Sequence, residues 1–75
     1  MEEIKQFFIK IGRADVDENM RNLVSDNIID SLDVMNLINE IEKHYNKTLD
    51  FDFMKPIYFE SFESIQKMLE IAMKD

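Results

Sequence analysis

The stretch at positions 26–45, DNIIDSLDVMNLINEIEKHY, constrains the fold most, because it combines a helix start signal with helical periodicity. Asp30 is a favourable N-cap residue, and Asp33 stands three positions later, where a capping box places its acidic partner. A helix is therefore expected to begin at Ser31. At roughly 100° per residue, apolar side chains form one narrow stripe that should face the core: Val34, Leu37, Ile38, Ile41 and Tyr45.

Ser31 is the candidate functional residue of this stretch. In the first helical turn, unpaired backbone N–H groups and the positive end of the helix dipole would stabilise a phosphate group on its hydroxyl. Leu32 and Met35 lie to one side of the core stripe and should be exposed beside Asp30 and Asp33, as in a docking surface. The alternative is an ordinary first-turn serine, with Leu32 and Met35 packed under a loop.

The rest of the chain also favours helices, because it is 45% hydrophobic and has only one Gly and one Pro. Apolar residues at helical spacing predict a first helix over residues 2–11, with Gly12 as its stop: Ile4, Phe7, Phe8 and Ile11. Ser61 is expected to cap a final helix that runs to about residue 74, with one apolar face: Phe62, Ile65, Leu69, Ala72 and Met73.

Two irregular segments separate these helices. Residues 13–29 predict a long loop with Asn27 in a left-handed turn, fastened to the core by four apolar residues: Leu23, Val24, Ile28 and Ile29. Pro56 limits regular helix in the segment after residue 50, so a short third helix or an irregular turn is expected, with aromatic and aliphatic residues in the core: Phe51, Phe53, Ile57 and Phe59. Residues 1–75 are thus expected to form a single all-α domain, a small four-helix bundle.

Charge and composition restrict the partners. The net charge of -7 repels nucleic acid and anionic lipid surfaces, and no stretch is long and apolar enough to span a bilayer. Without cysteine or a recognisable signal peptide, we expect a cytoplasmic protein. We also expect it to be a monomer. Positions 22–42 contain no Lys or Arg but five carboxylates: Asp26, Asp30, Asp33, Glu40 and Glu42. A partner with a basic patch would be steered to them. The alternative is that they form only a solvated helix face.

An independent enzyme is not expected. The single histidine, His44, follows Ser31 by thirteen residues on the same helix, about 20 Å along its axis at 1.5 Å per residue, so it cannot activate that serine. The spacing of Asp15, Asp17 and Asn19, with Asp26 further on, is similar to a calcium-binding EF-hand loop, although Met20 stands where that loop requires Gly. An unmodified acidic interaction module or calcium-binding module is therefore the alternative to a role for Ser31.

The segment IIDSLDVMNLINEIEKHY resembles the DSL motif and following helix of acyl carrier proteins, and the order of elements resembles that family over essentially the whole chain. The resemblance implies that Ser31 carries 4'-phosphopantetheine through a phosphodiester, attached from coenzyme A by a magnesium-dependent phosphopantetheinyl transferase. The thiol of this arm would hold an acyl group as a thioester. Chemistry would then belong to the cofactor and the partner enzymes.

The resemblance also implies the docking residues and the class of cargo. Four residues match positions used for partner contact, and two more extend the acidic face: Asp30, Leu32, Asp33 and Met35, with Glu40 and Glu42. Asn36, Asn39 and Lys43 depart from the usual pattern of carriers for fatty-acid biosynthesis, whereas positions 51–62 are similar to D-alanyl carrier proteins. The expected function is an acyl carrier in fatty-acid or related lipid metabolism, or alternatively a stand-alone aminoacyl carrier loaded by an adenylating ligase.

Overall fold

Capping side chains determine where the two longest helices of this chain begin. In a computed structural model that describes residues 1–74, every regular element is helical and no strand occurs. The described residues form three α-helices and two short 3₁₀ helices: α1 (Glu2–Lys10), α2 (Ser31–Tyr45), η1 (Phe51–Phe53), η2 (Pro56–Phe59) and α3 (Phe62–Ala72). The all-helical class expected from the sequence is confirmed.

The predicted start of α2 at Ser31 is also confirmed. Asp30 Oδ1 accepts a hydrogen bond from the backbone N–H of Asp33 at 2.9 Å, and Asp33 Oδ2 accepts one from the N–H of Asp30 at 3.2 Å. Asn46 caps the C-terminal end of the helix in the left-handed conformation, with φ 53°. The capping box therefore places Ser31 at the first helical position.

Helix α3 begins with a second capping box. Ser61 Oγ accepts a hydrogen bond from the N–H of Ser64, and Ser64 Oγ accepts one from the N–H of Ser61, both at 3.1 Å. The predicted cap at Ser61 is thus confirmed, although its reciprocal partner is a serine rather than the usual Glu or Gln.

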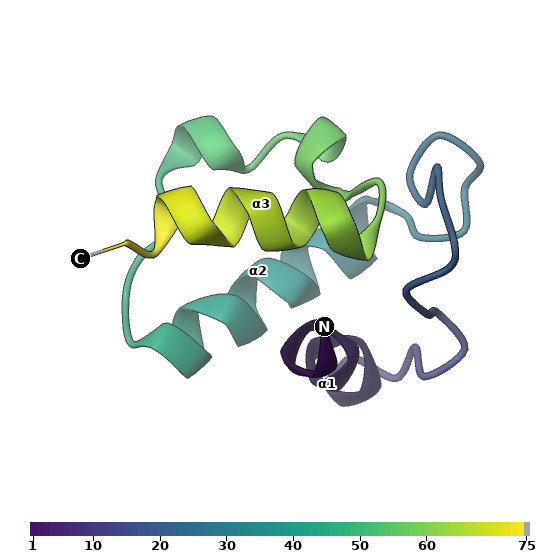
Figure 1. The fold of residues 1–75 in the computed structure, drawn as a ribbon, viewed down its shortest axis with the longest axis horizontal. Helices are drawn as coiled ribbons and strands as arrows, with labels where there is room; N and C mark the ends of the chain where they lie inside the picture. The colour runs from purple at the N-terminus through teal and green to yellow at the C-terminus, as the bar shows by residue number, and fades with distance from the viewer. Residues whose placement is uncertain (75) are drawn as a thin grey trace.

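The helices enclose the core within a globule of 31 × 21 × 21 Å. Helix α1 packs against α2 and α3, while η2 packs against α3 and α2. In Figure 1, α1 is seen end-on at the lower edge and η1 and η2 lie at the upper edge, with α2 and α3 between them. Most of the predicted apolar stripes are buried here, including all but Ile11 of the first helix and all but Tyr45 of α2; these two are partly buried.

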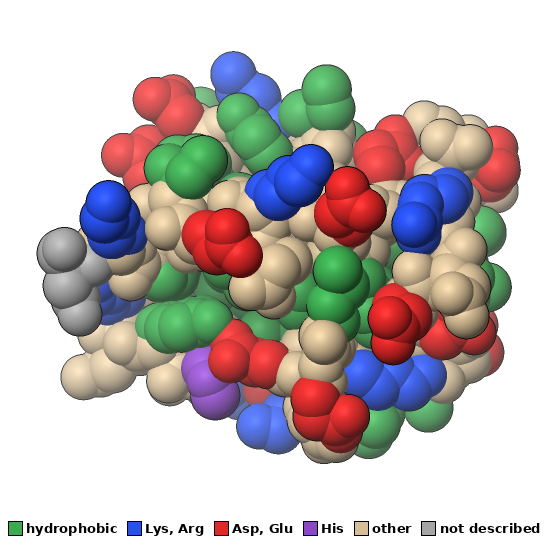
Figure 2. Space-filling model, in the orientation of Figure 1, with side chains coloured by type: hydrophobic (Ala, Val, Ile, Leu, Met, Phe, Trp, Pro, Cys, Tyr) green, Lys and Arg blue, Asp and Glu red, His purple; other side chains and the backbone are tan. Residues whose placement is uncertain are grey.

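The segment between α2 and α3 differs from the expectation in which residues it buries. Phe59 is fully buried and Phe53 partly so, but Phe51 and Ile57 are 80% and 70% exposed. The prediction that these two residues belong to the core is therefore wrong. A 3₁₀ helix of about one turn packs only one side against the core, and Phe51 and Ile57 lie on the exposed side of η1 and η2. Figure 2 shows hydrophobic side chains gathered at the upper edge of the molecule, over η1 and η2.

Residues 11–30 form the expected irregular segment. It is anchored to the core by three buried side chains, Val16, Leu23 and Ile29. Asn27 has φ 57°, which confirms the predicted left-handed turn before α2. In the part of the chain that the structure describes, no helix has both the length and the apolarity needed to cross a membrane.

Candidate functional site

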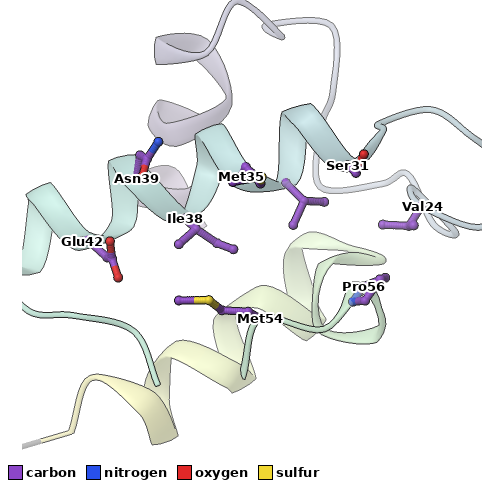
Figure 3. A pocket seen from close by; sticks show the side chains of 9 residues that line it. Val24, Ser31, Met35, Ile38, Asn39, Glu42, Met54 and Pro56 are labelled. Atoms are coloured by element: carbon purple, nitrogen blue, oxygen red, sulfur yellow. The ribbon is translucent and has the colours of Figure 1, made fainter. Parts of the chain in front are cut away.

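Ser31 is exposed and lies at one end of an elongated cavity of about 420 Å³ (Figure 3). One wall is α2, and residues from the preceding loop and from the η1–η2 segment form the other. Nine residues line it: Val24, Ser31, Val34, Met35, Ile38, Asn39, Glu42, Met54 and Pro56. Ser31 therefore borders a mainly apolar space rather than a flat helix surface.

The lining of the α2 wall follows helical geometry. Ser31, Met35, Ile38 and Glu42 are separated by four, three and four residues, so they fall on one face of the helix. Figure 3 shows Ile38 and Glu42 directed from α2 toward Met54 on the opposite wall. From Ser31 to Glu42 the cavity follows α2 for about 16 Å, at 1.5 Å per residue.

Leu32 and Met35 are 65% and 63% exposed, as their helical phase predicts. Met35 also lines the cavity, which the sequence analysis did not anticipate. Together with exposed Asp30, they surround Ser31 with two large apolar side chains and one carboxylate. This part of the predicted docking surface is accessible to a partner.

The other three predicted docking carboxylates already have partners within the chain. Asp33 Oδ2 accepts a hydrogen bond from Arg13 at 2.8 Å, and only 18% of its side chain is exposed. Glu40 pairs with Lys43 at 3.0 Å, and Glu42 Oε2 accepts the backbone N–H of Leu49 at 2.8 Å. The negative charge around Ser31 is therefore smaller than the sequence of positions 22–42 suggests, because the fold brings Arg13 to Asp33.

Arg13 joins the start of the long loop to the first turn of α2. Besides Asp33, its guanidinium donates two hydrogen bonds of 3.0 Å to the two oxygens of Asp15. The hydrogen bond with Asp15 raises the pKa of Arg13 and lowers the pKa of the Asp15 carboxyl. Arg13 thus restrains the chain beside Ser31, a role that the sequence pattern did not indicate.

The residues with EF-hand-like spacing do not converge on one point. Asp15 is paired with Arg13, while Asp17 Oδ1 accepts the backbone N–H of Asn19 at 2.9 Å. Among residues 1–74, no group of three or more His, Asp or Glu side chains is placed to hold a metal ion. The geometry therefore offers a calcium-binding role no support.

His44 lies near the opposite end of α2 from Ser31, where it packs edge-on against Phe7 with ring centroids 5.3 Å apart. Its Nε2 is 3.6 Å from a carboxylate oxygen of Glu3, and 44% of the side chain is exposed. The neighbouring Tyr45 hydroxyl donates a hydrogen bond to Glu3. Burial, and to a smaller extent this hydrogen bond, raises the pKa of Tyr45 to about 12.

Comparison with protein-family models, curated proteins and solved structures found no match. A functional assignment for this chain therefore depends on the chemistry and geometry of the site and on the sequence motif around Ser31.

Glu60 is a residue of this region that the sequence analysis missed. Its carboxylate accepts hydrogen bonds from the Ser25 hydroxyl and from the backbone N–H groups of Val24 and Ser25 at 2.9 and 3.0 Å. Its carbonyl oxygen also accepts the N–H of Leu23 at 2.9 Å. Glu60 thus holds in place the loop whose Val24 lines the cavity. This contact joins distant parts of the chain, so no local sequence pattern indicates it.

We expect Glu60 to make folding stability depend on pH. The hydrogen bonds from Ser25, first from its hydroxyl, lower the pKa of the Glu60 carboxyl below its ordinary value of 4.5. A carboxyl whose pKa is lower in the folded state contributes stability above its unfolded pKa and loses it as pH falls through the folded pKa. Chemical denaturation from pH 7 to pH 3 should show Glu60→Gln about 1 kcal/mol less stable at neutral pH, with the difference shrinking in acid.

Glu63→Gln provides the control, because Glu63 pairs with Lys67 on the exposed side of α3. It should change stability by less than about 0.5 kcal/mol. A constant difference between Glu60→Gln and the wild type down to pH 3 would contradict the role given to the Glu60 charge.

Proposed function

We propose that this chain is a carrier protein that holds acyl groups as thioesters on a 4'-phosphopantetheine arm attached to Ser31. The observation that carries the proposal is the position of Ser31: an exposed residue at the first position of α2, at the mouth of an apolar cavity and beside exposed Leu32 and Met35. A phosphodiester at a helix N-terminus is stabilised by the helix dipole and by unpaired N–H groups.

The attachment needs no catalytic group from this chain. A phosphopantetheinyl transferase with bound magnesium would supply the base, and the coenzyme A that it binds would be the electrophile. The Ser31 oxygen would bond to the phosphorus that carries pantetheine, the diphosphate bond of coenzyme A would break with adenosine bisphosphate as the leaving group, and the hydroxyl proton would pass to the transferase. The carrier contributes an accessible hydroxyl and a surface that the transferase recognises.

The cavity supports the proposal that the arm carries an acyl group as a thioester. A flexible arm on Ser31 can turn back along α2, and the apolar side chains of Val34, Ile38 and Met54 would shield the thioester and its acyl group from water. Its dimensions suit a small ligand, since pockets for such ligands begin at about 300 Å³. We further propose that η1 and η2 take the place of a short third helix, which would make the architecture a four-helix bundle of acyl-carrier type.

The partners are proposed from the same surface. The transferase, an acyl- or aminoacyl-loading ligase and the acyl-processing enzymes would each bind the start of α2, with apolar side chains around Leu32 and Met35 and a basic group against Asp30. The net charge of -7 would steer partners with basic patches toward the protein. Asp33 and Glu40 would contribute only where a partner displaces Arg13 or Lys43.

Modification by a transferase tests the proposal. The purified protein is incubated with coenzyme A, magnesium and a broad-specificity phosphopantetheinyl transferase, and its intact mass is then measured. We expect an increase equal to one phosphopantetheine group, located on Ser31 by peptide mapping. A protein that stays unmodified, while a known carrier in the same tube is loaded, would overturn the proposal and favour an unmodified interaction module.

The docking surface allows a second test by a matched pair of variants. Leu32→Asp should lower kcat/KM for the transferase about tenfold, because a buried apolar anchor of an interface contributes about 1.4 kcal/mol or more. Ile71→Asp is the control, since Ile71 is 67% exposed, close to the 65% of Leu32, but lies on α3. Equal rates for the two variants would show that the start of α2 is not the docking surface.

A further inference from the structure

The long loop before α2 brings a guanidinium to the first turn of that helix. Arg13 Nη1 donates to Asp33 Oδ2 at 2.8 Å, and Asp33 lies two residues after Ser31. Only 18% of the Asp33 side chain is exposed. Within the chain, this carboxylate therefore already has the kind of charge-assisted partner that a basic side chain of another protein would offer it.

Arg13 is itself held in position by its neighbours. Its Nε and Nη2 donate to the two oxygens of Asp15, both at 3.0 Å, so one planar guanidinium bridges two carboxylates. Gly12, at φ 83°, turns the chain after α1, and the backbone N–H of Arg13 donates to the carbonyl of Phe8 at 2.8 Å. The guanidinium therefore approaches Asp33 from a fixed backbone.

The loop just after Arg13 is fastened to α1 as well. Lys5 Nζ donates to the carbonyl oxygens of Ala14 and Val16 at 2.6 and 2.7 Å, and the Val16 side chain is fully buried. A group that is already ordered loses little conformational entropy when it makes a contact, whereas a partner's free side chain must be ordered on binding. A basic side chain of a partner would thus compete poorly with Arg13 for Asp33.

The surface that remains accessible beside Ser31 is mainly apolar. Leu32 and Met35 are exposed, and Asp30 is an exposed carboxylate that forms no salt bridge within residues 1–74. Surface ion pairs contribute little in water, so exchanging Arg13 for another cation at Asp33 would gain less than forming a new pair. A partner would gain most by covering the two apolar side chains.

We propose that Arg13 is a specificity-determining residue that takes the place of a partner's cation at Asp33. The chain then favours partner enzymes that bind the start of α2 by apolar contact, and it discriminates against those whose affinity depends on a basic side chain paired with Asp33. This inference rests on the proposed carrier function and adds to it the class of partner surface that the protein accepts.

A double-mutant cycle tests this role. Loading by a phosphopantetheinyl transferase with a basic docking patch is measured as kcat/KM for the wild type, Arg13→Gln, Asp33→Asn and the double variant. Asparagine keeps an oxygen that can accept the Asp30 N–H of the cap. At low salt we expect Arg13→Gln to raise kcat/KM about threefold and Asp33→Asn to cancel that gain. At about 0.5 M salt the gain should largely disappear, because screening weakens the new ion pair.

Arg21→Gln is the matched control for net charge. Arg21 lies in the same loop, but its Nη1 donates to the backbone carbonyls of Glu18 and Met20 rather than to a carboxylate. Its substitution removes one positive charge, as Arg13→Gln does, and should change kcat/KM by less than about 1.5-fold. An equal gain in the two variants, or a gain in Arg13→Gln that persists with Asp33→Asn, would overturn the inference.

Circular dichroism checks that each variant is folded, and Arg13→Lys replaces Arg13→Gln if that variant is not. Lysine keeps the charge but lacks the planar fork that bridges Asp15 and Asp33, so we expect a smaller gain, again cancelled by Asp33→Asn. If Arg13 only stabilised the loop, its variants would lose stability without any gain in rate, which would also overturn the inference. A wild type that stays unloaded beside a loaded known carrier would instead overturn the carrier function, so the two failures are distinguishable.

Discussion

Ser31→Ala should abolish phosphopantetheine attachment completely while leaving the fold intact. The serine oxygen is the atom that would bond to phosphorus, and alanine offers no substitute for it. Within the described chain the Ser31 hydroxyl makes no hydrogen bond, because the cap of α2 is built from Asp30 and Asp33. The substitution at the first helical position should therefore change the free energy of unfolding by less than about 0.5 kcal/mol.

Intact mass after the transferase reaction measures the loss of attachment, and circular dichroism with urea denaturation measures the fold. Ser25→Ala is the matched control, because Ser25 is also an exposed serine in an acidic neighbourhood but lies in the loop that Glu60 holds. Ser25→Ala should still take up one group. Attachment to Ser31→Ala would place the modification on another residue and would contradict the assignment of this site.

The elements that the sequence predicted well are those whose signals are local. The Asp30 cap, the apolar stripe of α2 and the Ser61 cap each depend on residues within one or two turns of each other, so helical geometry alone determines them. The exposure of Leu32 and Met35 followed from the same geometry. The position of Ser31, on which the proposed function depends, could thus be derived without the tertiary structure.

The features that the sequence did not reveal depend on contacts between distant parts of the chain. Arg13 and Asp33 are twenty residues apart, and Glu60 lies 35 residues from Ser25, so no periodic pattern relates them. The cavity likewise forms only when Met54 and Pro56 face α2. Its carboxylate end at Glu42 could not be distinguished from an ordinary acidic helix face by sequence alone.

Phe62→Ala should be among the most destabilising single substitutions in this chain. The Phe62 side chain is 1% exposed and stacks on Phe8, with ring centroids 5.0 Å apart and an interplanar angle of 11°. Its removal leaves a cavity where α1 meets α3, at a cost of about 3 to 5 kcal/mol. A domain of this size has a total stability on the order of 4 to 11 kcal/mol, so the variant should lose much of it.

Phe51→Ala is the matched control, and it distinguishes the structure from the sequence interpretation that placed Phe51 in the core. Phe51 is 80% exposed, so its loss should change the free energy of unfolding by less than about 0.5 kcal/mol. Urea denaturation followed by circular dichroism compares both variants with the wild type through their midpoints. Comparable losses in the two variants would mean that Phe51 is buried in solution, which would contradict the arrangement of η1 and the cavity wall that follows it.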